Sequence, residues 1–443
     1  MSSSPAGEPL LYRTIEVPAE LTTTTCVKGR SIRFGGDVRL GNLRGGGQAD
    51  FLVYRSVDVA HDEGGMKPCF VGAFTSQGQT LWSVGDGGDQ PCRPGPVSVY
   101  DLDGDGRDEV ICFFLNPAME ATSDSMANIT VQVRDGRTGE VRHQAAPAEL
   151  CSCRDKGPNW CHQRLLIANF RGNPRPRDLV VKMGAKVLAL TDQLEVLWTY
   201  ESPWTEYSRC PAYIPAVGDI DGDGCDEVLG GYYLLDEDGT PLWEQQLARH
   251  MDSVAIAPWD AGRMRAICSG YGHVVDAEGG VVLRLGEDAV PHGQEVRVAP
   301  FLADGRTQMV LRYNGHTPQV MVVDAEGTIV KRLDLNPTRN NTGMEPVFWD
   351  GPHRARLCNG GTLWDLADGS HVDLPGLPEA EPVGRMAWYH CIAADLCGDR
   401  REEVVLYNPW STTIYVYSPQ PLEETAFGGY CPGPRQHNAR LMD

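Results

Sequence analysis

The chain has no long apolar run. Nowhere in its 443 residues do about 18 consecutive apolar side chains occur, which is the length that a membrane-spanning helix needs. The first residues, MSSSPAGEPLLYRTIEVPAE, also lack the basic start and apolar stretch of a secretory signal. The sequence as given therefore predicts a cytoplasmic protein with no membrane partner, or a secreted one if a signal has been removed.

Basic residues are scarce as well. Lys and Arg together number 39 against 60 Asp and Glu, which gives a formal net charge of −21. Nucleic acids and anionic membranes bind to positively charged surfaces, so this balance excludes a general binder of either. An anionic ligand must therefore meet a local basic pocket.

Helical periodicity is almost absent, whereas the 50 glycines and 31 prolines suit short strands joined by tight turns. One pattern recurs, in which an acidic glycine turn separates two apolar strands, as in VSVYDLDGDGRDEVICFF from Val97 and PAVGDIDGDGCDEVLGGYY from Pro215. Its eight copies have turns near Asn42, Asp101, Asn169, Asp219, Trp259, Pro300, Trp349 and Asp395. Their mean spacing of about 50 residues is typical of a four-stranded propeller blade. The sequence predicts an all-β, monomeric, single β-propeller domain over 1–443 with eight blades, the segment 1–32 closing the last one.

The two clearest turns place carboxylates at alternate positions, namely Asp101, Asp103 and Asp105, and Asp219, Asp221 and Asp223. Calcium uses such oxygen ligands. However, the glutamate that an EF-hand has at its twelfth position is missing, and both turns lie between strands. The pattern therefore favours side chains that cap their own turns, with calcium binding as the alternative.

Among the 14 cysteines, Cys151, Cys153 and Cys161 could form a structural zinc site with His162. No matching cysteine pair gives the usual spacing of such a site. An ordinary loop with free thiols is therefore the favoured interpretation.

Histidines gather in one class of loop. In a propeller, the loops that enter the innermost strands and the connections between second and third strands open on the same rim, where ligands usually bind. Seven of the 11 histidines fall there: His61, His162, His250, His273, His292, His316 and His390. So many titratable groups from different blades predict a functional site on this rim.

The same loops supply cations and aromatic rings. The arginines are Arg93, Arg164, Arg209 and Arg312, and the aromatic residues are Tyr207, Trp388, Tyr389 and Trp410. Arginines would form a cationic pocket suited to an anionic substrate such as a uronic acid. The rings could stack on sugar faces or belong to the core.

Four residues stand five positions before their turns, and thus near the tunnel mouth: Asp37, Arg164, Glu295 and His390. Asp252 and Glu345 lie close to the same ring. Carboxylates around an axis repel one another unless a cation or an arginine lies among them. We therefore expect a divalent metal, most simply calcium, or a purely hydrogen-bonded ring as the alternative. The expected metal ligands are Asp37, Asp252, Glu295, Glu345 and His390.

These blocks resemble the L-rhamnose-α-1,4-D-glucuronate lyases and the related propeller α-L-rhamnosidases that act on gum arabic and arabinogalactan. Stretches that carry the resemblance include GGMKPCFVGAF from Gly64, NWCHQRLLIANFRG from Asn159 and the ending PRQHNARLMD. It covers nearly the whole chain, from about Arg33 to Asp443. That family is described as seven-bladed, whereas eight repeats are counted here.

The resemblance implies an anionic oligosaccharide or polysaccharide as the partner. It implies removal of a terminal L-rhamnose from O4 of D-glucuronate by β-elimination, which leaves an unsaturated uronate. Elimination needs a group that neutralises the carboxylate, a base for the C5 proton and an acid for the departing oxygen. The expected catalytic residues are His61, His162, His250, His292, Arg164, Arg209 and Tyr207. The expected substrate-binding residues are Arg93, Arg312, His316, Asn341, Trp388, Tyr389 and Trp410.

Two other functions fit the same sequence. An α-L-rhamnosidase would cleave the same bond with water, typically between two carboxylates. A non-catalytic propeller would bind carbohydrate through the same loops. The dense set of histidines favours catalysis, because a lectin has little need for groups that titrate near neutral pH.

Overall fold

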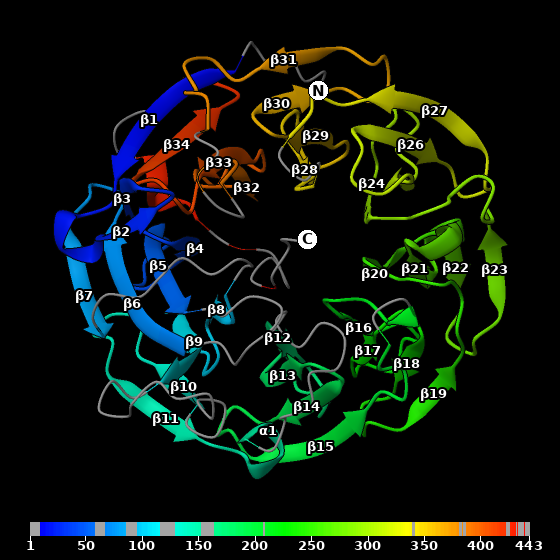
Figure 1. Cartoon of the computed structure of the whole chain (residues 1–443), viewed down its shortest axis with the longest axis horizontal. Coiled ribbons are helices and arrows are strands. Elements are labelled where there is room, and N and C mark those ends of the chain that lie inside the picture. Colours follow the sequence, from blue (N-terminus) through cyan, green and yellow to red (C-terminus); the bar gives the residue numbers. More distant parts are fainter. Residues whose placement is uncertain are drawn as a thin grey trace.

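Eight four-stranded antiparallel sheets stand around a central axis as the blades of a propeller (Figure 1). The structure is a computed structural model that describes residues 9–57, 67–85, 95–115, 129–151, 164–206, 209–338, 342–380, 383, 387–421, 426–430, 432 and 438. The all-β propeller with eight blades, which the repeats predicted, is confirmed.

Each blade runs outward from its innermost strand, and we number the blades along the chain. Blade 1 comprises β4 (Asp37–Gly41), β5 (Asp50–Val57), β6 (Lys67–Thr75) and β7 (Thr80–Gly85). Blade 2 comprises β8 (Val97–Tyr100), β9 (Glu109–Leu115), β10 (Ile129–Arg134) and β11 (Val141–Ala145). Blade 3 comprises β12 (Arg164–Ala168), β13 (Asp178–Met183), β14 (Lys186–Leu190) and β15 (Val196–Glu201). Blade 4 comprises β16 (Ala216–Gly218), β17 (Glu227–Leu229), β18 (Tyr233–Leu235) and β19 (Pro241–Glu244).

The second half of the ring repeats this order. Blade 5 comprises β20 (Val254–Pro258), β21 (Met264–Cys268), β22 (His273–Val275) and β23 (Val281–Arg284). Blade 6 comprises β24 (Glu295–Ala299), β25 (Gln308–Arg312), β26 (Gln319–Val323) and β27 (Ile329–Asp334). Blade 7 comprises β28 (Glu345–Val347), β29 (Arg356–Asn359), β30 (Thr362–Trp364) and β31 (His371–Asp373). Blade 8 comprises β32 (His390–Ala394), β33 (Glu403–Tyr407), β34 (Thr413–Ser418) and the N-terminal β1 (Leu10–Glu16).

The ring is closed by strands from both halves of the chain. β1 pairs with β34 in antiparallel register from Leu10↔Ser418 to Glu16↔Thr413. Ile15 of β1 is only 2% exposed and packs in a core cluster with Val405 and Ile414. A separate hairpin of β2 (Thr23–Val27) and β3 (Arg30–Phe34) follows β1. The N-terminal segment thus supplies the outer strand of the last blade.

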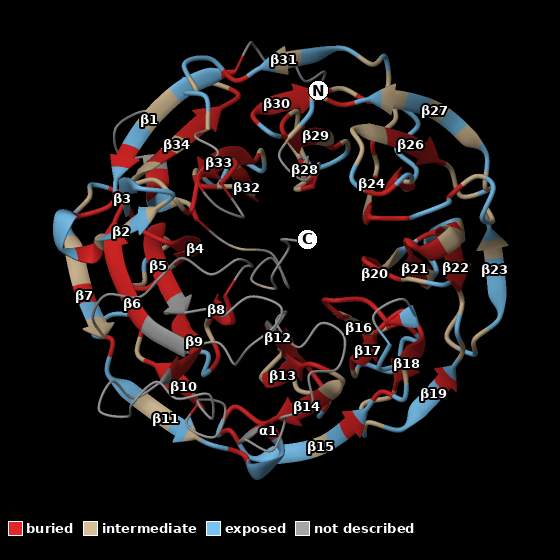
Figure 2. Cartoon of the chain, viewed as in Figure 1, coloured by how far each residue is buried: buried red, intermediate tan, exposed pale blue. Residues whose placement is uncertain are grey.

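Burial follows the order of the strands within a blade. The second strands are flanked on both faces by neighbouring blades, so β13 and β25 are buried along their whole length. The outermost β27 alternates between exposed and half-buried residues. Figure 2 shows this gradient from the buried interior to the exposed outer edge. Apolar β-branched runs therefore form the inner strands, and alternating sequences form the outer ones.

The eight predicted turns all lie between the first and second strands of their blades. Since the innermost strand of a blade starts at one rim and ends at the other, these turns lie on the rim opposite to the loops that enter the blades. The loops that carry the predicted histidines therefore lie on the face away from the acidic turns. We call the histidine-bearing face the entry rim.

Helical segments are few and short among the described residues. They are α1 (Ala148–Cys151) and the 3-10 turns η1 (Ala19–Leu21), η4 (Asp260–Gly262), η5 (Gly270–Gly272) and η7 (Ala426–Gly428). None of them is long and apolar enough to cross a membrane.

A cavity of about 500 Å³ lies among the innermost strands of blades 3 to 7. Ile256, Val298 and Phe348 contribute to its apolar lining. Asn438, near the end of the chain, also lines it and accepts a 2.6 Å hydrogen bond from the backbone N–H of Ile167 in β12. Distant parts of the sequence therefore meet in the centre of the ring.

Because β1 closes the ring, side chains on its buried face should contribute more to the free energy of unfolding than side chains on its exposed face. Replacing Ile15 by alanine should lower the free energy of unfolding by about 2–4 kcal/mol, because it removes buried methyl groups from the junction with blade 8. Leu11→Ala on the same strand should cost under about 1 kcal/mol, because Leu11 is 39% exposed. Urea unfolding of both variants checks this, and equal effects would contradict closure through β1.

Candidate active site

Three consecutive entry loops bring together a group of titratable side chains on the entry rim. Cys210 and Tyr213 precede β16, His250 and Asp252 precede β20, and His292 precedes β24. These loops lead into blades 4, 5 and 6, which are neighbours in the ring, so their side chains meet on one part of the entry rim. The group therefore joins residues that are about 80 positions apart in the chain.

Asp252 is the centre of the group. Its Oδ1 lies 2.9 Å from Nε2 of His250, and its Oδ2 lies 2.9 Å from Nε2 of His292. The Asp252 side chain is 2% exposed, so both histidines take the place of the water that would otherwise solvate the carboxylate. The arrangement fixes the orientation of both imidazole rings.

His250 is the inner histidine of the pair. Its Nδ1 lies 3.4 Å from Sγ of Cys210, and its Nε2 also lies 3.1 Å from the hydroxyl of Tyr213. Burial disfavours the charged form of His250, but the hydrogen bond to Asp252 and the contact with Cys210 outweigh it and raise the pKa to about 11. The contact with Asp252 thus favours the protonated form of His250.

His292 is the outer histidine and reaches solvent, with 45% of its side chain exposed. The connection between β25 and β26 holds its backbone, since Gly315 N–H donates to the His292 carbonyl at 2.8 Å. Gly315 has φ +59° and lies against the imidazole, where a Cβ would meet Nδ1 at 3.6 Å. Within the described part of the chain, no hydrogen bond engages Nδ1 of His292. This nitrogen is therefore available to a ligand on the entry rim.

The predicted arginines divide between the rim and the interior. Arg209 is exposed and directly precedes Cys210, and Arg249 is exposed and directly precedes His250. Arg312 is 1% exposed, with Nη1 donating to the Thr317 carbonyl at 2.7 Å. Burial lowers the pKa of Arg312, against the opposing effect of Glu295. Arg312 therefore lies between blades 6 and 7, not at the exposed surface of the group.

The predicted ring of metal ligands is held by protein groups. Glu295 lies 3.0 Å from Nη2 of Arg297 and 3.6 Å from Nε of Arg312, and Arg297 also lies 4.0 Å from Glu345. Asp37 accepts a 2.5 Å hydrogen bond from Gly95 N–H. Arginines thus lie among these carboxylates, and calcium binding at the ring stays a prediction.

His390 and the aromatic residues lie in blade 8 or beside it. The His390 ring lies 4.9 Å from that of Trp388 and 5.4 Å from that of Tyr407. Tyr389 is 5.9 Å from Tyr415, and Trp410 is 5.2 Å from Phe34. These rings pack against one another, so sugar stacking by Trp388, Tyr389 and Trp410 stays a prediction.

The remaining predicted residues are placed as follows. His273 is buried, and its Nδ1 bonds the Gly270 carbonyl at 2.8 Å, while His316 is exposed two residues beyond Asn314, which forms an isolated β-bridge with His292. Residues outside the described part of the chain are His61, Arg93, Cys153, Cys161, His162, Tyr207 and Asn341, together with the side chains of Cys151 and Arg164.

Two members of the group were not predicted. Cys210 and Tyr213 share an entry loop with the predicted Tyr207 and Arg209, and both contact His250. Their sequence signal is membership of that loop, because cysteine and tyrosine residues also occur in ordinary cores.

The comparison with known families identifies the chain's relatives. The profile described as "Rhamnogalacturonan lyase family 11, C-terminal domain" matches residues 188–428, more than half of the chain. The rhamnogalacturonan endolyase YesW of Bacillus subtilis is 23% identical over 461 residues, which cover 91% of this chain and 70% of that protein. The rhamnogalacturonan exolyase YesX of the same organism is 26% identical over 306 residues, 59% of this chain and 46% of that protein.

Solved structures share the fold. The crystal structure of YesW matches with a TM-score of 0.67 at 21% identity, over 94% of this chain and 77% of that one. The rhamnogalacturonan lyase of Bacillus licheniformis matches with a TM-score of 0.67 at 20% identity, over 97% and 78%. The polysaccharide lyase class predicted from the sequence is confirmed. The chain belongs to rhamnogalacturonan lyase family 11 and is a carbon–oxygen lyase that acts on polysaccharides.

Proposed function

We propose that this protein cleaves rhamnogalacturonan by β-elimination at O4 of a uronate, with His292 as the base. The observation that carries the proposal is the pairing of a half-exposed His292 with the buried Asp252 on the entry rim. The names of the relatives support the polymer, since both act on rhamnogalacturonan.

The chemistry follows from the structure of a uronate. The base removes the C5 proton, the electron pair forms the C4–C5 double bond, and the C4–O4 bond breaks as O4 takes up a proton. In a polymer of alternating rhamnose and galacturonate, the group that departs with O4 is rhamnose. The same step would release the terminal rhamnose of a Rha-GlcA unit, so both linkages present the same reacting atoms.

Asp252 determines which ring nitrogen of the proposed base, His292, carries the proton. Its Oδ2 accepts a hydrogen bond from Nε2 of His292, which places the proton of the neutral ring on Nε2. The lone pair then lies on Nδ1, the nitrogen with no hydrogen bond in the described part of the chain. Asp252 is thus a positioning residue, and His292 is the group that touches the substrate proton.

Elimination also requires positive charge near the uronate carboxylate, and cationic groups beside His292 would supply it. The C5 proton is acidic enough only when the charge of the uronate carboxylate is offset. The ring centre of His250, whose protonated form its contacts favour, lies 5.5 Å from that of His292, and the exposed Arg209 and Arg249 directly precede Cys210 and His250 in the sequence. Together these cations offset the negative charge of the whole chain at this one place.

The His250–Asp252–His292 group offers two imidazoles and one carboxylate within 4.8 Å. Such a donor set suits zinc and similar transition metals, whereas calcium prefers oxygen ligands. The calcium ion predicted for the entry rim was assigned a different set of ligands, of which only Asp252 belongs to this group, and it stays a prediction. The elimination proposed here assigns its steps to side chains of the chain itself.

Hydrolysis fits the same group less well. A retaining or inverting glycosidase uses two carboxyl groups that flank the bond. Asp252 is buried and engaged by two histidines, so it is not positioned as a free acid or nucleophile. The geometry favours elimination over the α-L-rhamnosidase reaction.

Products distinguish the alternatives. Rhamnogalacturonan and, separately, a Rha-GlcA disaccharide are incubated with the protein while ultraviolet absorbance of an unsaturated uronate and free rhamnose are followed. We expect absorbance to rise with rhamnogalacturonan. A rise in absorbance with Rha-GlcA but not with rhamnogalacturonan would show that the Rha-GlcA linkage is the substrate. Free rhamnose without a rise in absorbance would indicate hydrolysis. The absence of both products would indicate a carbohydrate-binding protein.

A further inference from the structure

A second groove opens on the entry rim, over blade 8. Its volume is about 390 Å³, within the range of sites that bind small ligands. Two entry-rim segments line it, namely 378–380 ahead of β32 and the connection 408–412 between β33 and β34, and β3 of the N-terminal hairpin forms a further wall. Among the described residues, it shares no lining side chain with the cavity in the centre of the ring.

Backbone hydrogen bonds hold the hairpin against blade 8. The N–H of Gly35, directly after β3, donates to the Ser411 carbonyl at 3.0 Å. The N–H of Val17, directly after β1, donates to the Thr412 carbonyl at 2.8 Å. The segment that closes the ring therefore also fixes the β3 wall of the groove.

Three half-buried aromatic rings border the groove: Tyr389, Trp410 and Tyr415. The fully buried Phe34 packs against Trp410 with ring centres 5.2 Å apart, and Tyr389 meets Tyr415 edge to face at 5.9 Å. These contacts hold the rings in place while each still lines the groove. A fixed aromatic ring at the wall of a groove can stack against the C–H face of a sugar.

Two exposed arginines of the β3 wall, Arg30 and Arg33, bring positive charge to the groove. Arg33 donates to the Thr22 hydroxyl at 2.7 Å and to the Ala19 carbonyl at 3.3 Å, and both of these oxygens are neutral. Glu379 is the one carboxylate among the described lining residues. The cations of the groove therefore outnumber its anions.

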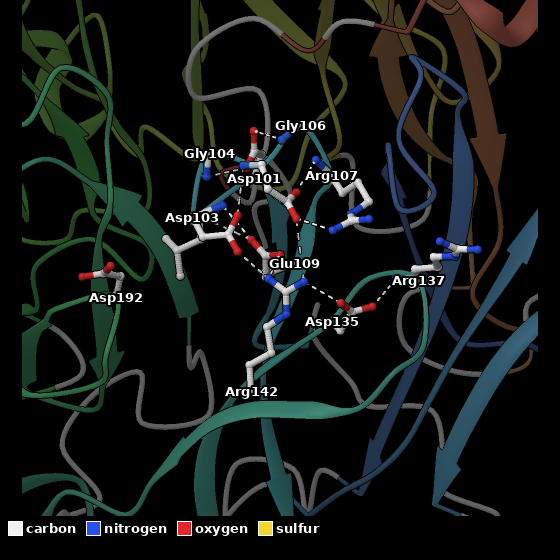
Figure 3. A network of polar contacts seen from close by, with 12 residues as sticks. Asp101, Asp103, Gly104, Gly106, Arg107, Glu109, Asp135, Arg137, Arg142 and Asp192 are labelled. Carbon is white, nitrogen blue, oxygen red and sulfur yellow. Dashed lines mark hydrogen bonds and ion pairs between the residues drawn. The ribbon is translucent and has the colours of Figure 1, made fainter.

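Arg142 of β11 shows how arginines are neutralised elsewhere in this chain. On the opposite rim it pairs with Asp103, Glu109 and Asp135 (Figure 3). Arg33, by contrast, forms no ion pair with any residue that the structure describes. In a chain with a net charge of −21, an arginine without a carboxylate partner beside aromatic rings suits an anionic ligand.

Polar groups of the groove suit the hydroxyls of a sugar. The side-chain oxygen of Asn408 accepts from the Trp410 backbone N–H at 3.0 Å, and within the described residues no hydrogen bond engages its Nδ2. Ser31 and Ser411 line the same groove. The groove thus combines a stacking surface, positive charge and hydrogen-bonding groups, which are the three features that recognise a sugar acid.

We infer that this groove is a second binding site for the acidic polysaccharide, occupied by a part of the polymer that is not being cleaved. A uronate carboxylate pairs with Arg33, and a sugar ring stacks on Trp410. The identity of the polymer rests on the proposed function, since alternating uronates present a carboxylate to both sites. Blades 8 and 5 stand on opposite sides of the central axis (Figure 1), and both sites open on the entry rim. A long chain therefore spans both sites, whereas a short one fills only one of them.

Affinity gel electrophoresis with rhamnogalacturonan tests the inference. It is run on the His292→Ala full chain, so that cleavage does not consume the ligand. Adding Trp410→Ala should raise the dissociation constant by about tenfold, the effect of removing an aromatic anchor, and Trp410→Phe should keep most of the affinity. Arg33→Ala should raise the constant by a similar factor. Arg306→Ala, an exposed arginine on the opposite rim, is the matched control and should leave the affinity unchanged.

Kinetics with His292 intact separate the groove from the active site. In Trp410→Ala, the ratio of kcat/KM on the polymer to kcat/KM on a rhamnogalacturonan tetrasaccharide should fall by about tenfold, because only the polymer gains from a second contact. An unchanged ratio, or unchanged polymer affinity in Trp410→Ala and Arg33→Ala, would overturn the inference even if the protein cleaves rhamnogalacturonan. Affinity that falls in both variants, with no cleavage by the wild type, would support the groove and overturn the proposed function instead.

Discussion

Replacing His292 by alanine is expected to lower kcat on rhamnogalacturonan by about 10²–10⁴-fold, the usual contribution of a positioned general base. The variant should fold normally, because 45% of the His292 side chain is exposed. Steady-state rates from ultraviolet absorbance, with circular dichroism of the variant, measure both effects. Asp252→Asn should also slow the reaction and change its pH profile, because it alters the orientation and tautomer of His292.

The control for this prediction is another histidine of the same chain. His353 is exposed and lies between β28 and β29, on the rim opposite to the entry rim. His353→Ala should keep kcat within a few-fold of the wild type. If His292→Ala did the same, the base would lie elsewhere, and the histidines outside the described residues would be the next to replace.

Replacing Arg312 by leucine is expected to reduce the free energy of unfolding by about 3 kcal/mol. The substitution leaves Arg297 as the one cation that the described structure pairs with the fully buried Glu295, and it removes the bonds to the Thr317 carbonyl and to Oδ1 of Asn359, the latter at 3.1 Å. It therefore loosens the contact between blades 6 and 7. Chemical denaturation measures the loss.

Arg306→Leu is the matched surface control. Arg306 pairs with Asp304 and Glu326, but 57% of its side chain is exposed, so its removal should cost under about 1 kcal/mol. A loss at Arg312 no larger than that at Arg306 would contradict a structural role for Arg312. If the Arg312→Leu variant kept its stability but had a raised KM, Arg312 would be a substrate-binding residue, as the sequence predicted.

The repeats were sufficient to predict the ring. Period-2 apolar runs and glycine turns depend on local chemistry, so the turns near Asp101, Asp219 and Asp395 predicted strand ends correctly. Counting from those turns also placed Glu295 and His390 at equivalent positions near the tunnel mouth, and in the structure each is the first residue of an innermost strand. Local pattern and topology together thus fix which rim a residue occupies.

The same reasoning could not predict which groups the side chains contact. Arg312 ends a second strand, and the sequence does not reveal that its guanidinium points between blades towards Asn359. Asp252 was predicted as a metal ligand, but one of its two histidine partners, His292, is 40 residues away in another loop.

The mass balance of a single cleavage tests the central claim, elimination at a uronate, most directly. A rhamnogalacturonan oligosaccharide of known mass is digested by the wild type, and the two fragments are weighed by mass spectrometry. Elimination predicts fragment masses that sum to the mass of the intact oligosaccharide, with one fragment bearing an unsaturated uronate. Masses that sum to the oligosaccharide plus one water molecule, with both uronates saturated, would contradict the account.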